Sequence, residues 1–550
     1  MRRASFASLV ALFSAYACGQ SPQINYRGVV NAASFTPQGL PGGGIAQGSI
    51  FTISGRRLGP SAPLLATGFP LAATLGGVSI KVFQGAKSVD ALPLFVSSSQ
   101  ISAVMPSNAP LGLVSVQITY NSSRSNPSPV RVVSAAFGIF TVQNSGLGPG
   151  ILYAGAQNQQ LNNLIATATP GQTMTVWGTG LGPIAGADNN APPPGNLPTP
   201  VEIFVGGQKA AVQSSRRTGC CAGVDQIVFT IPSTAPQGCW VPIQVRTGGN
   251  VVSNSVTMAI SSEGSPCSEP ANPASQVLIP GGKIAAFLAS RFSVRHDVAV
   301  PKPLEASSEY LGGYLTLVSP GPFNFNPILS LPPAGTCTTF SIPAEGPLLP
   351  GVAPTANGLN AGPLAFAGAA GSVALNALTL AGVAGAYLGG SLPAIQQLMG
   401  SLFLNPGTFT LTGGGGQDIG QFSASTNVQP TFTWTNRDQL TAVVRSDGLT
   451  VSWTGAAPGY SIVVIGMGAD LPANAASAFL CMSKSGDTSL TVPPVALANI
   501  PATHIRLTQS LGAIYVGELP LGNAATIGAN GLDYGFVMPS QALGKSVEFQ

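Results

Sequence analysis

The sequence predicts an all-β protein made of tandem immunoglobulin-like sandwiches followed by a further β-rich region. Its 69 Gly and 48 Pro residues recur between short apolar runs, and this spacing argues against long helices. Those runs alternate apolar and polar residues with a period of two, as strands with one buried face do. The chain also contains an internal repeat. At 550 residues it has room for about three to five domains.

The internal repeat consists of two motifs that recur in the same order. Residues 48–60 (GSIFTISGRRLGP) recur as residues 171–183 (GQTMTVWGTGLGP), an offset of 123. Residues 100–112 (QISAVMPSNAPLG) recur as residues 226–238 (QIVFTIPSTAPQG), an offset of 126. Repeating units of this size, with short strands and frequent turns, predict two β-sandwiches of immunoglobulin type.

The repeat sets the predicted domain boundaries. We expect one sandwich at residues 24–142, a second at 143–262 and a Ser-, Pro- and Asn-rich linker at 263–275. Residues 276–550 are predicted to form a further sandwich-like region, with a split near residue 400 as one option. Its strands are expected at 408–412, 431–435, 449–453, 461–465, 479–483 and 489–493, with residues 484–488 as the turn between the last two.

The repeated strand motif carries a family resemblance. A glycine, an alternating strand and then Gly-x-x-Leu-Gly resemble the start of IPT/TIG domains, which are immunoglobulin-like modules of cell-surface and extracellular proteins. Residues 29–35 (VVNAASF) and 137–140 (FGIF) more closely resemble the uncharacterised Solibacter-type C-terminal repeat of secreted soil-bacterial proteins. In that family the second copy often carries the segment found here at 219–227 (GCCAGVDQI). The resemblance covers roughly residues 25–262 and implies fold and location, but no catalytic residue.

The N-terminus has the features of an export signal. A basic start is followed by a short apolar run, and Ala15 and Ala17 fit the small-x-small cleavage rule, which predicts a signal peptide at residues 1–17. Cys18 follows directly, so a lipid anchor at this cysteine remains an alternative to simple secretion. We therefore expect the protein outside the cell or in the cell envelope.

Six later cysteines predict disulfides, because an even set in an exported chain is typical of them. Neighbouring residues of an extended segment point to opposite faces, so we expect Cys220 and Cys221 to take separate partners. The nearest candidates are Cys239 and Cys267, and the pairing among these four stays open. The remaining two, Cys337 and Cys481, are then expected to pair with each other.

The charge content limits the partners that the sequence suggests. Only 7% of residues are charged and the net charge is +4, which provides no basic stripe for nucleic acid. The pairs Arg56-Arg57 and Arg216-Arg217 are expected to be solvated turn residues. The uncharged stretch at 346–417 is interrupted by Gly, Asn and Pro and is not expected to span a membrane.

The inventory of reactive residues argues against an enzyme. The sequence has no Gly-x-Ser-x-Gly motif and only two histidines, His296 and His504, neither of which lies in a catalytic pattern. There is no CxxC pair, so a zinc site lacks ligands. Loop calcium at 188–190 or 436–438 is conceivable from the Asn and Asp residues there but has no motif behind it. We expect no cofactor.

Four tryptophans are the candidate contact residues. Trp434 and Trp453 lie on predicted strands and are expected in a core, and Trp240 is expected to pack against a disulfide at Cys239. Trp177 takes the place of Ser54 in the first copy, and it is our candidate for an exposed ligand contact. The sequence therefore favours a non-catalytic binding, adhesion or scaffold protein whose partner is an extracellular protein or polysaccharide. The alternative is an accessory protein that binds carbohydrate during polysaccharide processing.

Overall fold

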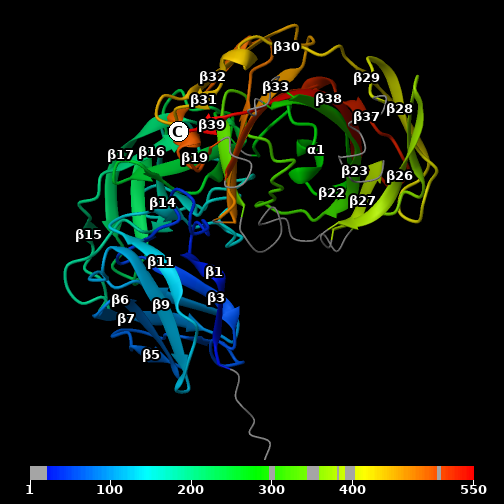
Figure 1. The fold of residues 1–550 in the computed structure, drawn as a ribbon. Helices are drawn as coiled ribbons and strands as arrows, with labels where there is room; N and C mark the ends of the chain where they lie inside the picture. The colour runs from blue at the N-terminus through cyan, green and yellow to red at the C-terminus, as the bar shows by residue number, and fades with distance from the viewer. Residues whose placement is uncertain are drawn as a thin grey trace, which may run out of the picture.

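The computed structural model confirms the all-β prediction. It describes residues 21–264, 266–296, 304–342, 358–380, 383–389, 403–472, 474–504 and 510–550, so the predicted signal peptide and Cys18 lie outside the described residues. Three β-rich bodies follow one another along an arc (Figure 1). The helices of the described residues are one turn long: α1 (Ser275–Leu278), α2 (Pro494–Leu497), η2 (Arg437–Gln439) and η3 (Leu521–Asn523).

The first module is a sandwich whose two faces share one strand. The first half of β7 (Lys87–Val96) pairs with β6 (Val78–Gln84), and its second half pairs with β8 (Gln100–Val104). Alternating residues such as Phe51 and Val116 fill the core between the faces. The other strands are β1 (Gln23–Asn31), β2 (Ile45–Ala46), β3 (Ile50–Arg56), β4 (Leu64–Leu65), β5 (Thr74–Leu75), β9 (Gly112–Tyr120), β10 (Ser123–Arg124) and β11 (Ser128–Val133).

The second module repeats this arrangement. Here β17 (Gln208–Arg217) is the shared strand, between β16 (Val201–Val205) and β18 (Asp225–Thr230). The strand β12 (Gly138–Ile139) pairs with β14 (Thr173–Thr179), so the boundary predicted between residues 142 and 143 is too late. The remaining strands are β13 (Leu152–Ala154), β15 (Gly195–Asn196), β19 (Gly238–Thr247), β20 (Val251–Val252) and β21 (Val256–Ile260).

The C-terminal region is built on one 13-stranded sheet that bends strongly (Figure 1). Strands from both sides of residue 400 belong to it, so the optional split at that point is not a boundary of the sheet. Among its described strands, only β22 and β38 pair in parallel. Its strands are β22 (Gly282–His296), β23 (Leu304–Val318), β24 (Cys337–Ile342), β25 (Leu364–Gly368), β26 (Gly371–Leu380), β27 (Val383–Gly389), β28 (Gly407–Gly413), β29 (Phe422–Val428), β33 (Ser461–Asp470), β34 (Ala475–Met482), β36 (Ser510–Leu519), β37 (Ala525–Thr526) and β38 (Tyr534–Ser546).

A smaller sheet covers one end of the large one and makes this part a sandwich. It contains β30 (Thr433–Trp434), β32 (Leu449–Thr454) and β35 (Ser489–Val492), and β31 (Ala442–Val443) pairs with β39 (Glu548–Phe549) beside it. Trp434 and Trp453 face each other across β30 and β32 and are buried in the core, as predicted. Residues 484–488 connect β34 to β35 in a different sheet, so they are not the hairpin turn that the sequence suggested.

The segment predicted as a linker is packed between the second module and the C-terminal region. Cys267 is bonded to Cys239 of β19, and Asn272 and Ala274 are buried. Almost every residue of β19 is buried. Val241 and every second residue after it face the core of the second module, and Trp240 faces the C-terminal region. The two parts are therefore joined by a shared apolar core.

The six cysteines of the described residues form three disulfides, of which one corrects the sequence prediction. Cys337–Cys481 joins the facing strands β24 and β34, as predicted, and Cys239–Cys267 is one of the pairs that had stayed open. Cys220 and Cys221 are bonded to each other. The expectation of separate partners failed because these two residues lie in a bent loop and not in an extended strand.

None of the helices in the described residues is long and apolar enough to cross a membrane.

The disulfide Cys337–Cys481 closes the longest loop of the three, with a sequence separation of 144. Replacing both cysteines by Ala should lower the free energy of unfolding by about 3 kcal/mol, because the unfolded chain gains freedom. Urea unfolding of the oxidised protein measures this loss. An unchanged midpoint, or free thiols at both positions in the native protein, would contradict the assignment.

Candidate functional site

A buried ion pair lies at the joint between the first two modules. Arg217 ends β17 and Asp225 begins β18, and their side chains are 1% and 0% exposed. The Arg217 Nε donates to Asp225 Oδ1 at 2.5 Å, and the other carboxylate oxygen accepts the N–H groups of Gly180 and Leu181 at 2.9 and 2.8 Å. Burial raises the pKa of Asp225, and the charge of Arg217 together with these hydrogen bonds opposes that shift. Arg217 is thus not the solvated turn residue that we expected, whereas Arg56 and Arg57 are exposed.

The loop between these two charged residues reaches the first module. The Thr179 hydroxyl donates to the Gly223 carbonyl at 2.5 Å and accepts the Ile50 N–H at 2.8 Å. Gly223 has φ +72°, and a Cβ there would meet Ile50 at 2.7 Å. Ala222 packs with apolar residues of the first module, and the preceding residues form the Cys220–Cys221 disulfide. The family-like segment at 219–227 is therefore a piece of the inter-module joint.

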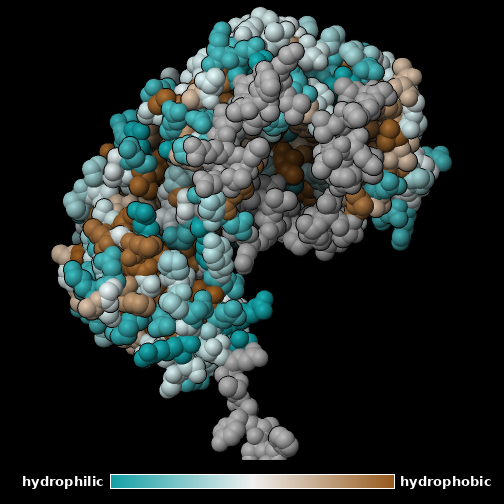
Figure 2. Space-filling model, in the orientation of Figure 1, coloured by the Kyte–Doolittle hydropathy of each residue, from teal (hydrophilic) through white to brown (hydrophobic). Residues whose placement is uncertain are grey.

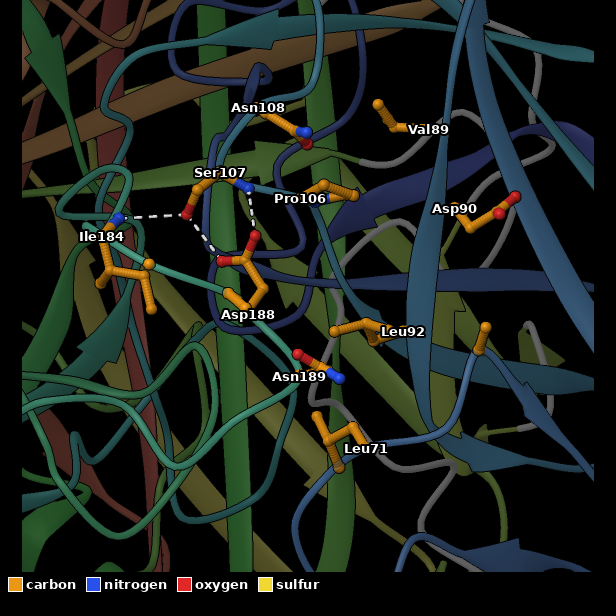
Figure 3. A pocket seen from close by; sticks show the side chains of 13 residues that line it. Leu71, Val89, Asp90, Leu92, Pro106, Ser107, Asn108, Ile184, Asp188 and Asn189 are labelled. Carbon is orange, nitrogen blue, oxygen red and sulfur yellow. Dashed lines mark hydrogen bonds between the residues drawn. The ribbon is translucent and has the colours of Figure 1, made fainter.

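A cleft of about 540 Å³ opens beside this joint (Figure 3). The Asp188 carboxylate of the second module accepts the Ser107 N–H at 2.8 Å and the Ser107 hydroxyl at 2.6 Å. The same hydroxyl accepts the Ile184 N–H at 3.0 Å, and the Leu71 N–H donates to the Asn189 carbonyl at 2.7 Å. Loops from both modules thus hold the cleft in one geometry.

The cleft combines apolar and polar walls. Leu71 and Leu92 belong to its apolar lining, and Asp90, Asn108 and Asp188 belong to its polar lining (Figure 3). Asp188 is engaged by Ser107 through both oxygens, which leaves the suggested calcium loop at 188–190 without a free carboxylate of its own. Within the described residues no group of three or more metal-binding His, Cys, Asp or Glu side chains occurs.

Trp177 lies away from this cleft, on β14. It is half-buried, its indole N–H donates to Asn158 Oδ1 at 3.0 Å, and its ring meets Tyr153 edge-on with centroids 6.4 Å apart. The structure therefore gives Trp177 a partly exposed position with its polar atom already engaged. It does not bring Trp177 together with the inter-module cleft.

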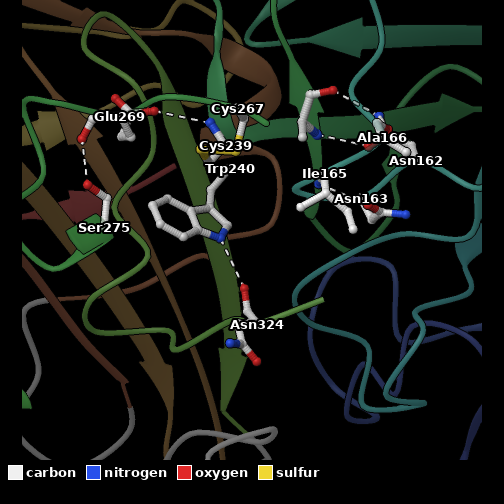
Figure 4. The surroundings of a disulfide bond; sticks show 11 residues. Asn162, Asn163, Ile165, Ala166, Cys239, Trp240, Cys267, Glu269, Ser275 and Asn324 are labelled. Atoms are coloured by element: carbon white, nitrogen blue, oxygen red, sulfur yellow. Dashed lines mark hydrogen bonds between the residues drawn. A yellow bond between two sulfur atoms is a disulfide. The ribbon is translucent and has the colours of Figure 1, made fainter. Parts of the chain in front are cut away.

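Trp240 occupies the position that the sequence predicted for it. It is fully buried beside the Cys239–Cys267 disulfide, and its indole N–H donates to the Asn324 carbonyl at 3.3 Å (Figure 4). The Glu269 carboxylate accepts the Cys239 N–H at 3.2 Å in the same neighbourhood. These residues connect the second module to the C-terminal region.

Three further titratable groups, buried or half-buried, lie in different parts of the chain. Burial raises the pKa of Glu269 to about 7 at the junction of the second module and the C-terminal region. Burial also raises the pKa of Glu518 to about 7, on β36 of the C-terminal sheet. His296 Nδ1 lies 2.8 Å from the Ser546 hydroxyl, at the end of β22. In the described part of the chain no hydrogen bond or ion pair joins any two of these three groups, so they do not form one site.

Exposed apolar side chains gather on the first module. Leu65, Leu111 and Leu113 are among its exposed residues. Figure 2 shows apolar patches on the face over the first two modules, interrupted by hydrophilic side chains.

Comparison with known proteins assigns no family. No family model matches the chain, and no curated protein sequence matches it. Among solved structures, the plexin A4 extracellular region is 14% identical over 46% of this chain and 20% of its own, with a TM-score of 0.15. This chain thus spans about a fifth of that protein.

Two glycan-utilisation proteins match over more of their length. SGBP-B from a xyloglucan utilization locus of Bacteroides uniformis is 14% identical over 70% of this chain and 89% of its own, with a TM-score of 0.17. SGBP-B from a mixed-linkage glucan locus of Bacteroides ovatus is 10% identical over 84% and 85%, with a TM-score of 0.13. These TM-scores are too low to transfer any property of these proteins to this chain.

The buried ion pair gives a sharp stability test. Arg217→Met should lower the free energy of unfolding by about 3–5 kcal/mol, because it leaves the Asp225 carboxylate buried without its charged partner. Arg56→Met is the matched control, and at an exposed site it should change the value by less than about 0.5 kcal/mol. Chemical unfolding measures both values, and equal losses of unfolding free energy in the two variants would contradict the role given to Arg217.

The raised pKa of Glu269 predicts that the free energy of unfolding depends on pH. Its pKa is raised from 4.5 to about 7, so between these values the folded state keeps a proton that the unfolded chain releases. The free energy of unfolding should therefore fall as the pH rises through this window. Glu269→Gln should raise it by about 2 kcal/mol at pH 8 and leave it unchanged at pH 4. The control is Glu263→Gln, at an exposed position. An effect of Glu269→Gln that does not change with pH would contradict the prediction.

Proposed function

We propose that this chain is an exported, non-catalytic binding, adhesion or scaffold protein whose first two modules are IPT/TIG-like and closest to the Solibacter-type repeat. Its place of action is the cell envelope or the extracellular space. The three disulfides support this location, because such bonds persist in oxidising compartments. The partner is an extracellular protein or polysaccharide that docks at the joint of the two modules.

The observation that carries this proposal is the preformed cleft at the joint. Its walls come from loops of both modules, and the Ser107–Asp188 hydrogen bonds tie those loops together. A preorganised site binds with a smaller loss of conformational entropy than loops that must order on contact. Loops on a rigid β scaffold are also the usual place for recognition.

The chemistry of the cleft supports binding over turnover. Ser107 is its candidate nucleophile, but the hydroxyl donates its hydrogen to Asp188 and lies beside no histidine among the described lining residues. Activation of a serine needs a neighbouring base that is itself oriented by a third group. The arrangement instead stabilises the loop geometry.

A second candidate function is that of an accessory protein in polysaccharide processing. The partly exposed Trp177 and Tyr153 pair on the second module favours it, because aromatic rings with a polar edge suit contacts to sugars. Under this function Trp177→Ala should abolish binding to a glycan array while leaving contacts at the cleft unaffected.

Binding of the full chain to immobilised cell-wall and extracellular polymers tests the proposal. Asp188→Asn should weaken retention about tenfold, because the loops from the two modules lose their charged hydrogen bonds. Asp447→Asn is the matched control, since Asp447 also accepts a serine hydroxyl, from Ser446, but in an exposed turn. Hydrolysis of any glycan, ester or peptide substrate by the pure protein, lost in His296→Ala or His504→Ala, would overturn the non-catalytic role.

A further inference from the structure

A second pocket, which shares no lining residue with the cleft, is built from an irregular stretch of β1. The register of β1 against β3 shifts between Ile24 and Val29, so residues 25–28 bulge out of the ladder. These residues line a pocket of about 430 Å³ together with Phe35 and Gln100 of the first module and Asn144 of the second. We call it the bulge pocket. Bulges of this kind re-aim side chains and are common beside functional sites.

Backbone strain is concentrated in the bulge pocket. Eight residues other than glycine have positive φ in the described chain, and three of them line this one pocket: Arg27 (φ 53°), Phe35 (φ 52°) and Asn144 (φ 51°). For Arg27 and Phe35 this conformation is unfavourable and persists only where the surroundings hold it, whereas Asn adopts it more readily. Such residues cluster at ligand-binding sites, so their gathering here points to a site.

The second copy of the module has a large side chain at a position that lines the bulge pocket in the first copy. Ser54 lines the bulge pocket, and its equivalent in the repeat is Trp177. The Trp177 indole packs against Tyr153 and donates to Asn158, which itself has positive φ. The first copy thus keeps a small side chain where the second copy places an indole.

The free groups of the bulge pocket define the ligand chemistry. Tyr26 is 57% exposed, and the Arg27 guanidinium lies 5.3 Å from its ring centroid. Arg27 donates to the Gln38 carbonyl, but no ion pair with a carboxylate is formed by it in the described chain, and the pocket is lined by no Asp or Glu. The side-chain amides of Gln100 and Asn144 make no hydrogen bond within the described residues. The pocket therefore offers an aromatic face, an unpaired cation and free amides.

We propose that the bulge pocket binds an acidic sugar, a hexuronate residue of an extracellular polysaccharide. The sugar ring packs on Tyr26, its carboxylate pairs with Arg27, and its hydroxyls bond to the amides of Gln100 and Asn144. Arginine pairs with carboxylates through two parallel hydrogen bonds, which favours an acidic sugar over a neutral one. This inference rests on the proposed binding function and adds to the cleft a second site with its own ligand class.

The test compares two forms of one polymer that differ at the carboxyl group, which is either ionised or a neutral methyl ester. Titration calorimetry with oligogalacturonate and with its fully methyl-esterified form should give at least tenfold tighter binding of the acid, with a loss of affinity as salt rises. Tyr26→Ala and Arg27→Asn should each weaken binding of the acid about tenfold, and Asn tolerates the positive φ of this position. Arg27→Lys should keep part of the preference for the acid.

The matched control is Arg57→Asn, because Arg57 is an exposed arginine of the same module with φ 57°. It should leave affinity unchanged, and thermal unfolding checks that every variant is folded. Equal affinity for acid and ester, or equal losses in the Arg27 and Arg57 variants, would overturn the inference. Retention of another polymer that depends on Asp188 and not on Tyr26 would leave the proposed function standing while this inference fails.

Discussion

The buried pair of Arg217 and Asp225 is the constraint on which the first half of the structure depends. Two charges removed from water cost several kcal/mol each unless hydrogen bonds replace the lost hydration. Here the replacements come from the N–H groups of Gly180 and Leu181 and from the Gly182 carbonyl, which accepts from Arg217 at 2.9 Å. The pair therefore fixes the loop after β14 and both ends of the loop that touches the first module.

The consequence is that the two repeated modules form one continuous structural unit. Gly48 of the first module lies against the Gly182 carbonyl, and a Cβ there would approach it to 2.8 Å. The equivalent glycine of the second copy, Gly171, also has positive φ but has open space around it. Ser54 of the first copy and Trp177 of the second copy are another pair of equivalent positions that differ. The two copies share their strands, but equivalent residues have different surroundings at the joint and in the bulge pocket.

The sequence predicted the fold well because strands and turns depend on local patterns. The alternation in residues 48–55 and 171–178 correctly located β3 and β14, and Trp434 and Trp453 were correctly placed in a core. The joint was not predicted, since Ser107 meets Asp188 only when distant loops come together. Arg217 and Asp225 are neighbours across the β17–β18 hairpin, but they also bond to the distant loop after β14. Two adjacent arginines look like a solvated turn, and two adjacent cysteines carry no local sign that they bond to each other. The segment at 219–227 was the available signal, but the sequence does not say what it contacts.

The central claim is that the first two modules are held rigidly together. The amide of Ile50 reports on it directly, because its hydrogen bond crosses the joint to the Thr179 hydroxyl of the second module. Hydrogen–deuterium exchange at this amide should be as slow as at its neighbours within the ladder of β3, and should become fast in the Arg217→Met variant. Fast exchange of Ile50 in the unmodified protein, beside slow exchange in the rest of β3, would contradict the account.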